Sequence, residues 1–108
     1  MAKATYWQRG ESLDYVNSGD TVIEANTIVA LGTRIGVVGT DINPKEKGSL
    51  HVTGVFEIAK VGGEIAMGAA VYFNGTGITT TSSGATPAGY AAANAAADDA
   101  VVLVKLLG

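Results

Sequence analysis

The stretch LHVTGVFEI, residues 50–58, is the most regular part of the chain and decides the fold class. Small or apolar residues occupy every second position on one face, namely Leu50, Val52, Gly54, Phe56 and Ile58. Successive side chains of a β-strand point to opposite faces, so a period of two predicts a half-buried strand. The stretch therefore indicates a sheet protein, with this face of the strand against the core.

Short β-branched or aliphatic stretches lie on both sides of this strand and predict further strands. They cover residues 21–23, 27–31, 34–38, 69–73, 78–81 and 101–107. Asn26, Gly32-Thr33 and Asn74-Gly75 separate several of them as hairpin turns would. In the last stretch Lys105 is the exposed exception of an otherwise buried strand.

Two polar stretches predict surface loops. In NPKEKG, residues 43–48, Pro44 fixes its own φ and favours an extended Asn43, while Gly48 can supply a positive φ. The second loop is SSGATP, residues 82–87.

The alanine-rich stretch of residues 88–97 allows two interpretations. Alanine is the best helix former, but the acidic pair Asp98-Asp99 suits a helix C-terminus poorly. Gly89-Tyr90 at its head and Asn94 near its end favour a strand followed by a turn, with a short helix as the alternative. No segment repeats at a fixed period.

The composition supports a small, turn-rich β protein. A chain of 108 residues with 15 glycines and 47% hydrophobic residues can build one core with many turns. We expect an all-β fold, a small antiparallel β-barrel or sandwich in residues 11–108, with an extended N-terminal arm in residues 1–10. Charged residues make up only 16%, against roughly 25% in average soluble domains, which favours association with other chains.

Charge and residue types argue against several classes of function. The net charge is −3 and the seven basic residues are dispersed, so we expect no nucleic-acid partner. No apolar run approaches the roughly 20 residues of a membrane span, and residues 1–10 lack the apolar core of a signal peptide. The chain has no cysteine, a single histidine and no phosphate-binding or calcium-binding loop motif. We therefore expect no metal, no cofactor and no enzymatic activity.

One pair could still imitate a catalytic site. Ser49 and His51 lie on the same side of the predicted strand, as the nucleophile and base of a small hydrolase would. No orienting carboxylate is evident, so an exposed histidine on the polar face is the simpler interpretation. Asp98 and Asp99 would point apart in an extended segment, which favours a solvated turn.

The N-terminal stretch contains the pair Tyr6 and Trp7, the latter the only tryptophan. Neighbouring residues of an extended segment face opposite ways, so at least one ring is available to a partner. The alternative is that both rings pack on the body of the same chain.

Four segments, taken in their order and spacing, resemble a known family. They are KATYWQRG at residues 3–10, GVVGTDINPKEKGSLHVTGVF at 36–56, GAAVYF at 68–73, and TPAGYA at 86–91 leading to Val101, Leu103, Lys105 and Leu106. Together they resemble the DUF2190 phage capsid cement proteins over nearly the whole chain. The resemblance implies a compact β-rich body that decorates the outer surface of a virion capsid and is made in the host cytoplasm. The capsid itself is built from a separate major capsid protein.

We accordingly expect a cement protein that binds the major capsid protein as a homotrimer, or alternatively as a homodimer. The predicted capsid-binding residues are those of the arm: Lys3, Tyr6, Trp7 and Arg9. Such an arm can add backbone hydrogen bonds to a neighbouring strand edge. A different class, a non-capsid adaptor or carbohydrate-binding β module, would use Trp7 and Tyr90 as stacking platforms.

Overall fold

The computed structural model describes residues 2–107, and these residues form nine β-strands and no helix. The strands are β1 Ser12–Val16, β2 Ile28–Ala30, β3 Ile35–Val38, β4 Lys47–His51, β5 Val55–Ala59, β6 Ala70–Phe73, β7 Ile78–Thr79, β8 Thr86–Ala91 and β9 Val101–Leu106. Met1 and Gly108, the ends of the predicted arm and body, lie outside the described residues. The all-β prediction is confirmed.

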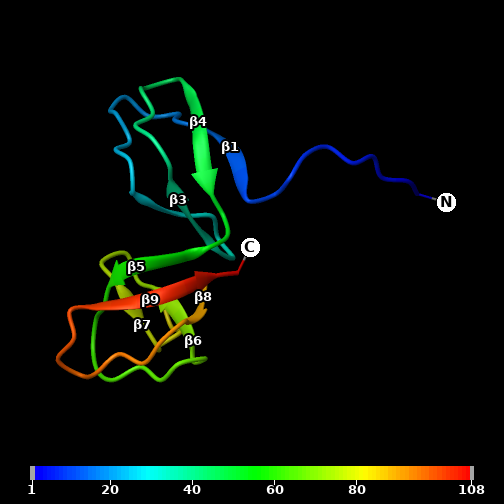
Figure 1. Ribbon diagram of the computed structural model, residues 1–108. Helices are drawn as coiled ribbons and strands as arrows, with labels where there is room; N and C mark the ends of the chain where they lie inside the picture. The colour runs from blue at the N-terminus through cyan, green and yellow to red at the C-terminus, as the bar shows by residue number, and fades with distance from the viewer. Residues whose placement is uncertain (1, 108) are drawn as a thin grey trace.

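The strands form two antiparallel sheets, which Figure 1 shows as an upper and a lower body. The strand order is β1-β4-β3-β2 in the first sheet and β5-β9-β8-β6-β7 in the second. Neither sheet closes into a barrel within residues 2–107. Nor does that part of the chain contain a helix long and apolar enough to cross a bilayer.

The predicted strand at residues 50–58 is divided between the two sheets. β4 ends at His51 and β5 begins at Val55, because Gly54 adopts a φ of 113°, which interrupts the extended backbone. The predicted inward face is correct on both sides of this break, since Leu50, Val52 and Ile58 are buried and Phe56 is half-buried. The prediction of one continuous strand was therefore wrong, although the predicted alternation of inward and outward side chains was right.

The start of β4 corrects the predicted loop at residues 43–48. The positive φ belongs to Lys45, at 67°, and Gly48 already lies within the strand. Gly48 is needed for a different reason, because a Cβ at this position would lie 2.5 Å from Cγ1 of the buried Ile42. Close packing between neighbouring segments, rather than turn geometry, requires this glycine.

The structure corrects the predictions for two further segments and confirms the preferred interpretation of a third. Residues 21–23 form no strand, and only Ile23 makes an isolated bridge, to Ile42. β8 begins inside the predicted loop at residues 82–87. Residues 88–97 contain the end of β8 and a turn, so the strand-then-turn interpretation is confirmed and the helix alternative is wrong.

The two sheets are structural repeats of each other, which the sequence did not reveal. With β7 set aside, in each sheet the first strand pairs with the last, the last with the third, and the third with the second. By this order β1, β2, β3 and β4 correspond to β5, β6, β8 and β9. β7 is an addition at the edge of the second sheet.

Matching hydrogen bonds outside the strands establish the repeat residue by residue. The backbone N–H of Ala25 donates to Asp41 Oδ1 at 2.8 Å, and that of Met67 donates to Asn94 Oδ1 at 2.7 Å. Each contact lies next to an isolated bridge, Ile23 with Ile42 or Ile65 with Ala95. The two halves thus share their turns as well as their strand order.

A buried polar side chain stabilises this region of the first half. Asn17 donates from Nδ2 to the carbonyl oxygens of Thr21 at 2.7 Å and Ile42 at 2.9 Å. At the equivalent position Lys60 donates from Nζ to the carbonyls of Gly62 and Gly63, both at 2.9 Å. Different side chains at the equivalent position therefore each bind backbone carbonyls of their own half.

The apolar cores are shared unequally between the halves. Val38, Ile42, Leu50 and Val52 form a small core within the first half. The larger core belongs mainly to the second half, but it also contains two residues of β3, Ile35 and Val37. The first half therefore buries part of one sheet face against the second.

Candidate interaction surfaces

The predicted capsid-binding residues lie in the segment that precedes β1. Residues 2–10 have no strand, and Figure 1 shows this segment running away from the body. Lys3, Tyr6, Trp7 and Arg9 are all exposed, the two aromatic residues at 82% and 88%. The two rings do not pack on the chain's own body, so the alternative offered in the sequence analysis is wrong.

The segment is also weakly attached to the body. A side-chain hydrogen bond joins Gln8 Nε2 to the carbonyl oxygen of Ser12, at 3.5 Å and exposed to solvent. This length is at the limit of a hydrogen bond. The body therefore contributes little to holding Tyr6 and Trp7 in place.

A second surface, which the sequence analysis missed, is the outward face of β9 and its neighbours. β9 was expected to be buried except at Lys105, yet Val101 and Leu103 are exposed and Lys105 is half-buried. Val102, Val104 and Leu106 point the other way, into the core. Lys105 was the available signal, because on an alternating strand it marks the outward face to which Val101 and Leu103 also belong.

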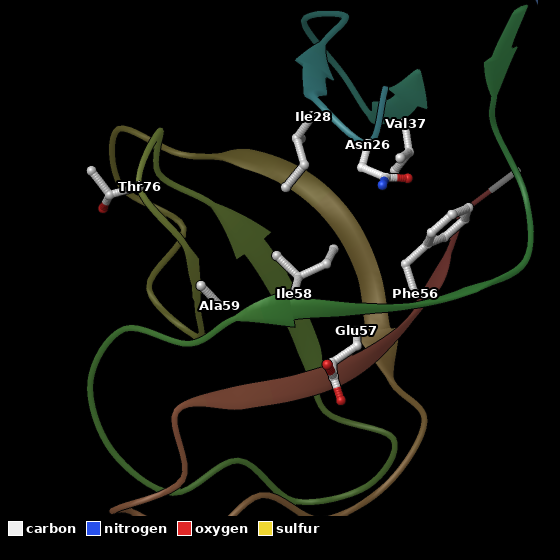
Figure 2. Close-up of a pocket in the computed structure, with 8 residues that line it drawn as sticks. All are labelled: Asn26, Ile28, Val37, Phe56, Glu57, Ile58, Ala59 and Thr76. Atoms are coloured by element: carbon white, nitrogen blue, oxygen red, sulfur yellow. The ribbon is translucent and has the colours of Figure 1, made fainter. Parts of the chain in front are cut away.

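A groove of about 360 Å³ lies between the two halves. Figure 2 shows Phe56 and Ile58 projecting from β5 toward Ile28 and Val37, while Glu57 points to the other side of the strand. Of the lining residues contributed by the first half, Asn26 is the polar one (Figure 2). The groove is thus the unfilled part of a mostly apolar contact between the halves.

The suspected Ser49 and His51 pair does not form. The hydroxyl that contacts the histidine is Ser12 Oγ, 2.9 Å from His51 Nδ1 across the β1 and β4 ladder. The imidazole ring also lies beside Phe56, with ring centroids 6.1 Å apart. These contacts connect β1 and β5 to the end of β4.

Asp99, the second residue of the acidic pair before β9, has a structural role. Asp99 accepts a hydrogen bond from the backbone N–H of Ala96 at 2.8 Å, which closes the turn before β9. This agrees with the predicted turn. Across residues 2–107, no three His, Cys, Asp or Glu side chains gather as a metal site would require.

The described surfaces define a protein whose exposed features are an aromatic segment and an apolar sheet face. The family model of phage cement proteins matches residues 7–106, and the chain belongs to this family. No curated protein and no solved structure matches the chain. The match covers both structural repeats and begins at Trp7.

Proposed function

We propose that this protein decorates the outer surface of a phage capsid shell and stabilises contacts between major capsid protein subunits. The observation that carries the proposal is the cement-protein family match over residues 7–106. The DUF2190 assignment is part of the proposal and rests on the four sequence segments given above. Synthesis in the host cytoplasm and a position on the outside of the virion follow from the same role.

The proposed mechanism is attachment through many weak contacts, with no catalytic residue. A homotrimer, or alternatively a homodimer, presents the same contact several times to a symmetric shell. A contact with a Kd of about 10 μM is worth about −7 kcal/mol. Each further contact multiplies the affinity by the ratio of its effective concentration to its own Kd, so at an effective concentration of about 1 mM it adds about 100-fold. Each contact can therefore be weak while the attached oligomer stays on the shell.

The N-terminal segment is the proposed capsid contact. Residues 2–10 can reach about 30 Å when extended, enough to cross onto a neighbouring subunit. Tyr6 and Trp7 supply large apolar surfaces, while Lys3 and Arg9 supply charge. The backbone of this segment carries no ladder hydrogen bonds of its own, so it can add to an exposed strand edge.

Deleting residues 2–9 is expected to abolish attachment while leaving the body folded. The segment makes little contact with the body, so its loss should change the free energy of unfolding by less than about 0.5 kcal/mol. The measurement is co-sedimentation of the purified protein with undecorated capsid shells, alongside urea denaturation. Attachment at the level of the full chain would contradict the arm assignment.

A matched pair of variants tests whether attachment depends on the two aromatic rings or on any exposed apolar side chain. The double substitution Tyr6→Ala with Trp7→Ala should weaken co-sedimentation strongly. Met67→Ala removes an apolar side chain that is also well exposed, but it lies on a turn of the second half and should have no effect. Equal losses for both would show that the segment has no special role.

A further inference from the structure

The repeat allows the two sheets to be compared face by face. In each sheet one row of directly opposed residues crosses four strands on the same side. The row of the first sheet is Ile28, Val37, His51 and Ser12, and the row of the second is Ala70, Tyr90, Lys105 and Val55. The pairing registers make these rows equivalent, position by position.

The row of the first sheet is covered by the second half of the same chain. Val37 is only 4% exposed and belongs to the same core as Ile58. Figure 2 shows Ile28 and Val37 opposite Phe56 and Ile58 of β5. The fold thus already contains one example of how this face is covered.

The equivalent face of the second sheet has no cover. Tyr90 is 47% exposed and Val55 54%, and Leu103 lies on the same side at 40%. In the first sheet the position of Leu103 is taken by the exposed Ser49. Lys105 and Glu57, the latter directly opposed to Leu103, are the charged residues on this side. A largely apolar, uncovered face in a chain with few charged residues is typical of a protein contact.

The same repeat indicates what would cover this face. The covering strand inside the chain is β5, and its equivalent is β1, where Leu13 and Tyr15 replace Phe56 and Ile58. β1 is an edge strand paired only with β4, and Leu13 is 42% exposed. The first half of another copy therefore presents the surface that the second half presents within one chain.

We propose that copies of this chain associate head to tail, with β1 of one copy packing on the β5-β9-β8 face of the next. The contact continues between chains the packing already made between the two halves. A contact between two different surfaces generates a ring when the rotation closes, as a trimer does. This inference rests on the oligomer of the proposed function and names the surfaces that form it.

The first test is the solution mass measured by light scattering after size exclusion. The wild type should have the mass of three chains of 10.9 kDa, with two chains also supporting the contact. Leu103→Asp and Leu13→Asp should each give the mass of one chain. Ser49→Asp, at the position equivalent to Leu103, should leave the wild-type mass unchanged. A monomeric wild type, or equal masses for Leu103→Asp and Ser49→Asp, would overturn the proposal.

Mixing the two variants tests the head-to-tail arrangement itself. Leu13→Asp retains an intact sheet face and Leu103→Asp retains an intact β1, so their equimolar mixture should form a species of two chains. Neither variant should form that species alone. Circular dichroism and urea denaturation first establish that both variants are folded. An oligomeric wild type whose variants fail to associate when mixed would overturn the arrangement.

The capsid assay keeps this inference separate from the proposed function. A wild type that is oligomeric by light scattering but never sediments with capsid shells would refute the decoration role and leave the contact standing. A wild type that decorates shells as a monomer would refute the contact alone.

Discussion

Replacing Gly89 by alanine is expected to lower the free energy of unfolding by about 3–5 kcal/mol. Gly89 lies in the middle of β8 with a φ of 141°, a conformation that alanine rarely adopts. A Cβ here would also overlap the carbonyl oxygen of Lys105 on the paired strand β9. Because the obstacle is backbone, relief requires the two strands to separate.

The repeat supplies a matched control for this variant. Gly36 holds the same position in β3, but its added Cβ would meet the side chain of Leu50, at 2.6 Å, and its φ is not positive. A side chain can shift, so Gly36→Ala should cost about 1–3 kcal/mol. Gly63→Ala, in open space, should cost less than about 0.5 kcal/mol. Urea denaturation at one fixed protein concentration gives all three values, and a Gly89→Ala protein as stable as Gly63→Ala would contradict the assignment.

Asn17→Asp is expected to destabilise the fold by about 3–5 kcal/mol at neutral pH. Asn17 is 3% exposed, and its amide donates to the carbonyls of Thr21 and Ile42. A carboxylate has the same shape but cannot donate a hydrogen bond, so it would place a buried negative charge against these two carbonyl oxygens. The loss should show as a lower urea midpoint with little change in slope.

The pH dependence of Asn17→Asp has a definite sign. Burial and the two carbonyl oxygens favour the protonated acid, so the pKa of the new carboxyl is raised in the folded state above its unfolded value of about 3.9. Its protonated form is then compatible with folding, and the deficit against the wild type grows as the pH rises through the folded pKa. Below the unfolded pKa the deficit should be smallest. A deficit that does not vary with pH would show that the carboxyl is not buried.

The control for Asn17→Asp is the same substitution at Asn94, where the side chain needs only to accept a hydrogen bond. Asn94 accepts from the N–H of Met67, and in the first half Asp41 makes the equivalent bond to Ala25. Asn94→Asp should therefore change the free energy of unfolding by less than about 0.5 kcal/mol.

The strands that the sequence predicted correctly are those whose burial follows a local pattern. β3 and β6 are short apolar runs, and both halves of the interrupted strand at residues 50–58 kept the inward face set by their alternation. The turn at Asn74-Gly75 is also confirmed, since Gly75 has a φ of 100° and Asn74 Oδ1 accepts from the N–H groups of Thr76 and Gly77. Local chemistry was enough for these elements.

The elements that were missed depend on pairing across the chain. β1 has the polar sequence SLDYV, and it is a strand because the distant β4 supplies its ladder. The repeat could not be recognised in the sequence because equivalent positions carry different residues with the same role. Asn17 and Lys60 both donate hydrogen bonds to backbone carbonyls, and Asn26 and Gly68 both adopt a positive φ. Lys3, Tyr6, Trp7 and Arg9 were named from the sequence and are exposed, and their contact with a capsid stays a prediction.

In each sheet the first strand pairs with the last, and this pairing has a consequence for how the chain folds during synthesis. Ser12 pairs with His51, so the first half has all its strands, and its own small core, while the second half is still being made. Val55 pairs with Lys105, so the second sheet must wait for nearly the whole remaining chain. In the interval Ile35 and Val37 lack the residues that later cover them. Because domains generally fold in order from the N-terminus, the completed first half offers the emerging strands an apolar template on which to assemble.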